Sequence, residues 1–287
     1  MLIAGQPAEA SAPKEQGGDL DYVALGDSYA AAPGVPDQVD TECARSSRNY
    51  PSLVAERWKA RLTDVTCSGA TTADLAAGQH GAQAQYAALR PDTDLVTVSI
   101  GGNDGVPFST VLKTCAELSK SDPQGAPCRS HFTAGGSDRL LQGVAETAPK
   151  ISEVINTIHR RSPKAKVLVV GYPSIFPDSG VGCTSRSAPF SAGDFAYLRD
   201  TDKALNTMLA QRARTGGAAY IDTYTPTIGH DMCRPAEDRW IENLAPETPA
   251  APAHPNARGE AAMADAVNKA LAACPPGGKN PRSRTQM

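Results

Sequence analysis

Ser28 lies at a point of the chain where a side chain could act on a substrate. It follows the apolar run 22–26 by two residues, within the sequence Gly-Asp-Ser. In open parallel sheets, ligands bind in the crevice beyond the carboxyl ends of the strands. The sequence therefore predicts that the Ser28 hydroxyl faces such a crevice, where a base that removes its proton would make it a nucleophile.

Three other segments carry groups that acyl transfer requires, and each stands at a predicted strand end or helix start. They are Gly69 after the run 64–67, Gly101-Gly102-Asn103-Asp104 after the run 94–100, and His254-Pro255-Asn256 before the helical segment 257–273. A neutral imidazole is a suitable base near pH 7, so His254 is predicted to activate Ser28. Donors already in place stabilise a tetrahedral oxyanion. The backbone amides of Ser28 and Gly69 and the side-chain amide of Asn103 are the predicted donors.

The hydrophobic pattern predicts the sheet that brings these segments together. Five short apolar runs have strand character: 22–26, 64–67, 94–100, 166–171 and 218–222. Helical segments are expected at 50–62, 141–158, 192–215 and 257–273. Strands that alternate with helices pair in parallel through right-handed crossovers. The expected fold class is therefore α/β, a three-layer α/β/α sandwich around a central parallel sheet of about five strands.

Composition limits the kinds of protein that this chain can be. Its 287 residues carry a formal net charge of −3, and 40% of them are hydrophobic. This charge gives no reason to expect nucleic acid as a partner. No apolar run approaches the roughly 20 residues of a membrane span, and the cysteines and histidines lack the spacing of a structural metal site. We expect a monomer without metal or cofactor.

The two ends of the chain differ in composition from the rest. Residues 1–18 are rich in Ala, Pro and polar residues, and Ala10-Ser11-Ala12 is typical of a signal-peptidase site. We interpret 1–18 as a leader remnant or flexible N-terminus, 19–275 as one domain and 276–287 as a flexible tail. We therefore expect the protein to be exported, and the oxidising conditions outside the cell favour disulfide-bonded cysteines.

The segment 105–137 is too long to be a plain connection between elements. It contains Gly, Pro and Ser together with Cys115 and Cys128. A lid, a pocket wall and a disulfide-stapled loop are the alternatives that this composition leaves open.

The motifs together resemble those of the SGNH, or GDSL, hydrolases, and more narrowly the secreted actinobacterial lipases and esterases. The resemblance covers essentially the whole domain and rests on GDSY, CSGATT, SIGGND, DTYTPTIGHDMC and HPNARG. It implies that Ser28 is the nucleophile and His254 the general base and acid. It also implies an oxyanion hole formed by Ser28, Gly69 and Asn103. The other common serine-hydrolase signature, GxSxG, does not fit residues 26–30.

One position departs from the family pattern. Many members carry an Asp three residues before the catalytic His, where this chain has Ala251. Another acceptor must then fix the tautomer of the imidazole. In the similar actinobacterial enzymes a main-chain carbonyl does this, and the candidates here are the carbonyls of Pro252 and Ala251, with Pro252 favoured. The expected mechanism is a Ser–His dyad with backbone assistance.

The same resemblance implies how the cysteines pair. The expected bridges are Cys43–Cys67, Cys115–Cys128 and Cys183–Cys233, with Cys274 unpaired. Each bridge would contribute about 3 to 4 kcal/mol to stability in the chain-entropy account. The first would hold the segment that carries Gly69 near the loop after Ser28.

Several neighbouring residues receive simpler interpretations. Asp27 is expected to order the turn through hydrogen bonds to nearby backbone, and His230-Asp231 is expected to form a structural loop. Tyr29 and Phe108 border the predicted nucleophile and Asn103, so either could line an acyl pocket.

The resemblance favours a secreted enzyme that hydrolyses lipid acyl esters. A carbohydrate O-acetyl esterase is one alternative, which the aromatic content of 5% weakly disfavours. A non-catalytic extracellular binding protein is another, supported only by the missing Asp. Acyl-chain preference is expected to depend on a cleft formed by loops 30–48, 105–137 and 173–190.

Overall fold

A parallel sheet lies at the centre of the protein. The computed structural model describes residues 20–178 and 182–276. Within these ranges, five strands pair in parallel in the order β4-β1-β5-β6-β7. They are β1 (Asp21–Gly26), β4 (Arg61–Asp64), β5 (Leu95–Ser99), β6 (Lys166–Val170) and β7 (Ala219–Ile221). A small antiparallel pair, β2 (Gln38–Asp40) and β3 (Arg45–Ser46), follows the first strand.

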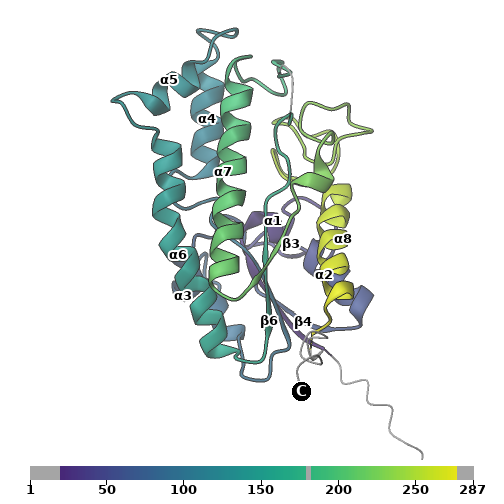
Figure 1. Cartoon of the computed structure of the whole chain (residues 1–287). Helices are drawn as coiled ribbons and strands as arrows, with labels where there is room; N and C mark the ends of the chain where they lie inside the picture. Colours follow the sequence, from purple (N-terminus) through teal and green to yellow (C-terminus); the bar gives the residue numbers. More distant parts are fainter. Residues whose placement is uncertain (1–19, 179–181, 277–287) are drawn as a thin grey trace, which may run out of the picture.

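Helices cover the sheet on both sides, as Figure 1 shows. The helices α4 (Phe108–Leu118), α6 (Arg139–Arg161) and α7 (Asp194–Thr215) stand together on one side. On the other side lie α2 (Tyr50–Trp58) and α8 (Ala257–Ala273). Shorter helical segments are α1 (Ser28–Ala31), α3 (Asp74–Ala77), η1 (Gln85–Ala88), α5 (Pro127–Thr133) and η2 (Thr225–Thr227). The predicted three-layer α/β/α fold is confirmed.

The central strands are buried because helices cover both of their faces. Every residue of β5 is buried, and only Lys166 of β6 is partly exposed. Their β-branched side chains suit such a doubly covered position. The apolar stripe of α6 packs against this core with Ile151, Val154, Ile155 and Ile158. At the start of that helix, however, Leu140 is buried and Leu141 is 46% exposed.

The expected boundaries differ most from the structure at α2 and β4. The helix expected over 50–62 ends at Trp58, because Lys59 adopts a left-handed φ of 51°. The strand expected over 64–67 is in fact β4, Arg61–Asp64. β4 is an edge strand paired only with β1, and its residues alternate between exposed and half-buried. Such a strand lacks the continuous apolar run by which buried strands are recognised.

Three disulfides join Cys43 to Cys67, Cys115 to Cys128 and Cys183 to Cys233, while Cys274 is exposed and free. This is the pairing that the family resemblance implied. The second bridge joins α4 to α5, so the segment 105–137 is largely helical and stapled. The predicted leader remnant, 1–18, lies outside the described residues, as does the tail beyond 276.

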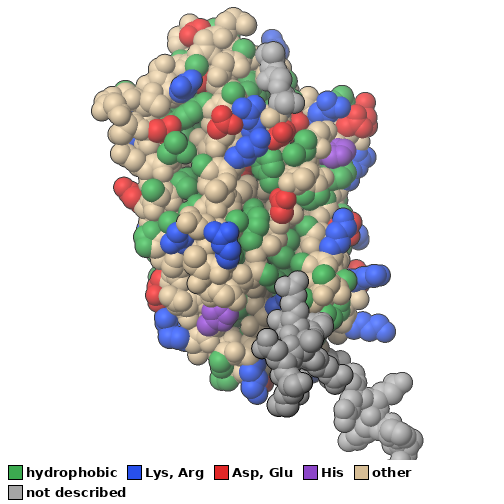
Figure 2. Space-filling view, viewed as in Figure 1, with side chains coloured by type: hydrophobic (Ala, Val, Ile, Leu, Met, Phe, Trp, Pro, Cys, Tyr) green, Lys and Arg blue, Asp and Glu red, His purple; other side chains and the backbone are tan. Residues whose placement is uncertain are grey.

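Charges of both signs are mixed on the face of the molecule that Figure 2 shows. Lys and Arg side chains are interspersed there with Asp and Glu. None of the helices in the described ranges is both long enough and apolar enough to cross a membrane.

Candidate active site

Ser28 and His254 are in direct contact. The Nε2 atom of His254 lies 2.7 Å from the Oγ atom of Ser28, although 226 positions separate the two residues. Ser28 opens α1 directly after the turn that follows β1, and His254 precedes α8, which Asn256 caps. The carboxyl end of β1 and the loop before α8 therefore meet at one edge of the sheet. Ser28 is 7% exposed and His254 is half-buried.

The second ring nitrogen of His254 contacts the main chain. Its Nδ1 atom lies 2.8 Å from the carbonyl oxygen of Pro252. The carbonyl of Ala251 instead accepts the backbone N–H of His254 at 3.2 Å. Ala253, between them, has a φ of 60°, and this turn directs the Pro252 carbonyl back toward the ring. With Nδ1–H donating to that oxygen, Nε2 presents a lone pair to the hydroxyl of Ser28.

The environment of His254 favours its neutral form. Burial lowers the pKa of His254 below its usual 6.5, and the hydrogen bond to the Pro252 carbonyl acts in the opposite direction. A neutral imidazole can accept a proton, so the arrangement can withdraw the hydroxyl proton of Ser28.

Ser28, Gly69 and Asn103, which carry the three predicted oxyanion donors, line one cavity. Within the described part of the chain, the backbone amides of Ser28 and Gly69 have no acceptor. The side-chain amide of Asn103 donates one hydrogen to the carbonyl of Ala70 at 3.0 Å, which leaves its second hydrogen for a ligand. Gly69 has a φ of 82°, a conformation that side chains disfavour.

The loop that carries Gly69 is fixed at both ends. The disulfide Cys43–Cys67 holds its start. Beyond Gly69, the backbone N–H and the hydroxyl of Thr72 donate to the carboxylate of Asp104 at 2.9 and 2.6 Å. This carboxylate links the loop after β4 to the loop after β5, so the donors on the two loops are held together.

Comparison with known proteins places the chain in a family. Residues 24–262 match the GDSL-like Lipase/Acylhydrolase family. The chain belongs to this family. A similar curated protein is Lipase 2 of Streptomyces coelicolor, 39% identical over 259 residues, which are 89% of this chain and 87% of that protein.

Two solved structures are similar over most of the chain. Phospholipase A1 from Streptomyces albidoflavus NA297 is 27% identical with a TM-score of 0.71. An extracellular lipase from Streptomyces rimosus is 29% identical with a TM-score of 0.71. In each case the match covers 88% of this chain and 99% of the other. As a member of the GDSL family, the chain is a carboxylic-ester hydrolase.

The cavity beside Ser28 is large and mainly apolar. Its volume is about 370 Å³, within the range of small-molecule sites. Apolar side chains from three helices line it: Val111 and Leu112 of α4, Val144 of α6, and Leu198 and Leu205 of α7. Tyr29 and Phe108 also line it, as the sequence suggested. Two of the three segments expected to form the cleft of this GDSL hydrolase, 105–137 and 173–190, do line the cavity, whereas no residue of 30–48 does. The first contributes through α4, and α6 and α7 supply walls that the sequence did not indicate.

Asp27 has a partner that the sequence did not indicate. Its carboxylate accepts the backbone N–H of Tyr29 at 3.0 Å, as expected, but also the hydroxyl of Tyr172 at 2.5 Å. Burial raises the pKa of Asp27 to about 7, although the hydrogen bond from Tyr172 lowers it. Tyr172 stands just beyond the predicted strand 166–171, and this place at the sheet edge is the only sequence signal for it.

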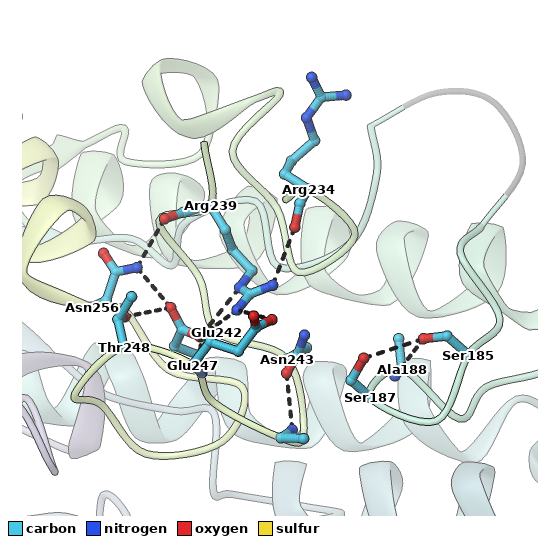
Figure 3. Close-up of polar contacts among 11 residues, drawn as sticks. Ser185, Ser187, Ala188, Arg234, Arg239, Glu242, Asn243, Glu247, Thr248 and Asn256 are labelled. Carbon is cyan, nitrogen blue, oxygen red and sulfur yellow. Dashed lines mark hydrogen bonds and ion pairs between the residues drawn. The ribbon is translucent and has the colours of Figure 1, made fainter. Parts of the chain in front are cut away.

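A buried ion pair supports the loop that carries His254 (Figure 3). The guanidinium of Arg239 lies 2.8 Å from the carboxylate of Glu242, and both side chains are almost fully buried. The same carboxylate accepts from the hydroxyl of Thr248 at 2.6 Å and the side-chain amide of Asn256 at 2.8 Å. The backbone N–H of Glu242 donates to the carbonyl of His254 at 2.9 Å. This cluster, which holds the loop on both sides of His254, was not indicated by the sequence.

The remaining candidates lie apart from Ser28. The ring of His230 stacks on Trp240, with centroids 3.5 Å apart, and Asp231 accepts the backbone N–H of Cys233. These contacts fit the structural loop that the sequence suggested. Among the described residues, no group of three or more His, Cys, Asp or Glu side chains is placed to hold a metal ion.

Proposed function

We propose that this protein is a secreted lipase or esterase that cleaves lipid acyl esters through an acyl-enzyme on Ser28. The observation that carries the proposal is the 2.7 Å contact between Ser28 Oγ and His254 Nε2, two residues that line a mainly apolar cavity. The nucleophile and its base thus stand where an acyl group would enter.

In the first half of the reaction, Ser28 Oγ attacks the ester carbonyl carbon while Nε2 of His254 takes its proton. The negative charge that forms on the carbonyl oxygen is stabilised by the amides of Ser28 and Gly69 and by the side chain of Asn103. The intermediate then breaks the bond to the alcohol oxygen, to which His254 returns the proton. The acyl group remains on Ser28.

In the second half, the same imidazole activates water. The water oxygen bonds to the acyl carbon as His254 takes a proton, and the bond to Ser28 Oγ then breaks as the proton returns to that oxygen. The acid leaves and the enzyme is restored. Throughout, the Pro252 carbonyl holds the imidazole in the required tautomer, the role that an Asp carboxylate has in a triad. The machinery is therefore a Ser–His dyad.

The size and lining of the cavity favour lipid acyl esters over acetyl esters. An acetyl group would fill only a small part of about 370 Å³, whereas a longer acyl chain would displace water from the apolar walls. The similar proteins carry the names lipase, esterase and phospholipase A1. Secretion is supported by the three disulfides, which persist in oxidising compartments.

Hydrolysis of p-nitrophenyl esters by the wild type and by Ser28→Ala tests the proposal. We expect Ser28→Ala and His254→Ala each to lose at least about a thousandfold in kcat. The matched control is Ser130→Ala, whose hydroxyl donates only to the carbonyl of Ala126 in an exposed helix. A fluorophosphonate probe should label the wild type and the control but not Ser28→Ala. Equal rates for the wild type and Ser28→Ala would leave only a binding function.

A further inference from the structure

One hydroxyl group connects the two segments that supply the nucleophile and the oxyanion donors. The hydroxyl of Tyr172 donates to the carboxylate of Asp27 at 2.5 Å and accepts the backbone N–H of Gly102 at 2.8 Å. Asp27 immediately precedes Ser28, and Gly102 immediately precedes Asn103. Tyr172 follows β6, and β5 lies between β6 and β1 in the sheet. The side chain of Tyr172 therefore reaches past the end of β5 to the turn after β1.

Tyr172 is itself held in place from several sides. Its backbone N–H donates to the side chain of Asn206 at 2.8 Å, and its carbonyl accepts from the same side chain at 3.1 Å. Its ring packs edge-on against Tyr29, with centroids 5.0 Å apart, and the residue is 2% exposed. A Cβ atom at Gly102 would lie 3.1 Å from the Tyr172 ring, so glycine permits the close approach. The position of the hydroxyl is thus fixed before any substrate binds.

We propose that Tyr172 is a positioning residue for ester hydrolysis, whose hydroxyl keeps the turn carrying Ser28 and the loop carrying Asn103 in register. This inference rests on the proposed function of Ser28. An oxyanion must receive hydrogen bonds from both segments at once, at about 2.7 to 3.1 Å. A displacement of about 1 Å can lower a rate about a hundredfold. Tyr172 also lines the cavity, but its hydroxyl bonds to Asp27 and Gly102 and not to Ser28 or His254.

A purely structural role makes a different prediction. If the hydroxyl only satisfied the buried carboxylate of Asp27, its loss would lower stability without changing turnover by the folded enzyme. The split between kcat and KM separates the two roles. A change in register weakens binding of the transition state and leaves binding of the ground state almost unchanged.

The test is Tyr172→Phe, which removes the hydroxyl and keeps the ring. We expect kcat for p-nitrophenyl esters to fall about 10- to 100-fold, with KM within about threefold of the wild type. The rate of phosphonylation by a fluorophosphonate probe should fall in parallel. The matched control is Tyr197→Phe, because the Tyr197 hydroxyl also donates to an aspartate, Asp138, at 3.0 Å and lies away from the cavity. The control should keep wild-type kcat.

A second variant guards against failure of Tyr172→Phe to fold. Asp27→Asn keeps the shape of the side chain but offers one strong acceptor in place of two, so it should also lower kcat with little change in KM. Because both changes act through one hydrogen bond, the double variant should lose hardly more than Tyr172→Phe alone. Full kcat in both single variants would overturn the positioning role. If those two variants keep full kcat while Ser28→Ala is inactive in the same assay, the positioning role fails and the proposed function stands. If Ser28→Ala is active, both the positioning role and the proposed function fail.

Discussion

The carbonyl oxygen of Pro252 lies 2.8 Å from Nδ1 of His254, so the partner of this histidine is an uncharged main-chain group. A carbonyl accepts the Nδ1 hydrogen and fixes the ring, as a carboxylate would, but adds no negative charge beside the imidazole. The pKa of His254 is lowered because the ring is buried and no carboxylate of the described residues bonds to it. A carboxylate in place of the carbonyl would raise this pKa. The position of the carbonyl depends on the left-handed turn at Ala253 and on a bond from the Tyr29 hydroxyl to the Ala253 carbonyl at 2.7 Å.

The proposed Ser–His dyad predicts that turnover survives removal of the carboxylate of Asp231, which is next to His230 in the sequence. Asp231→Asn should keep kcat within about threefold, because Asp231 caps a loop and does not line the cavity. His254→Ala, measured beside it, should lose at least about a thousandfold. Ester hydrolysis and circular dichroism of the two variants check this. An inactive but folded Asp231→Asn would point to a triad instead.

Burial of Asp27 predicts a dependence of stability on pH. Its pKa is about 7 in the fold against 3.8 for an unperturbed group, so the folded state favours the protonated form. The stability that Asp27 contributes is therefore present below about pH 4 and is lost as the pH rises through 7. Relative to Asp27→Asn, the wild type should lose up to about 4 kcal/mol between pH 4 and pH 8.

Denaturant unfolding of the wild type and Asp27→Asn at pH 4, 6 and 8 measures that difference. The sign is the informative part, because an aspartate whose pKa a salt bridge lowers would lose no stability as the pH rises over this range. A constant difference between the two proteins at all three pH values would mean that Asp27 titrates alike in the folded and unfolded chain.

The buried cluster of Arg239 and Glu242 is predicted to support both stability and turnover. Glu242→Gln removes the charge that balances Arg239, and this should cost about 3 to 5 kcal/mol in the free energy of unfolding. Because Glu242 also binds Asn256, kcat should fall as the loop of His254 loosens. The control is Glu117→Gln, which breaks an exposed pair with Lys120 and should change stability by less than about 1 kcal/mol.

Chemical denaturation and ester hydrolysis of these two variants, at a temperature where both are folded, provide the measurement. Equal stability of Glu242→Gln and Glu117→Gln would show that the buried pair contributes no more than a surface pair.

The helical walls of the cavity predict which residue limits the acyl chain. Val144 of α6 lines the cavity, so Val144→Trp should fill part of it. We expect kcat/KM for p-nitrophenyl decanoate to fall at least about tenfold more than that for the acetate. Leu141→Trp is the matched control, because Leu141 lies one turn away on the same helix and is 46% exposed. An unchanged chain-length profile in Val144→Trp would place the acyl chain elsewhere.

Much of the fold could be predicted from the sequence, because its signals are local. The runs LVTVS and KVLVV are buried on both faces, and such strands need continuous apolar residues wherever they occur. Helix α8 begins after Asn256, whose side chain accepts two backbone N–H groups, as its residue type suggests. β4 was misplaced because an edge strand needs no such run.

The same local rules indicated that the segments of Ser28 and Asn103 converge, since the carboxyl ends of parallel strands must meet at one edge of the sheet. Gly69 lines the same cavity although the strand before it was misplaced. The sequence alone thus determined which segments converge. Only the tertiary structure decided what holds them in register. The bond from Tyr172 to Asp27 spans 145 positions, and the bond from Asn256 to Glu242 spans 14 positions of an irregular loop. Neither has a periodic signature, because such contacts depend on how whole elements pack and not on the order of neighbouring residues.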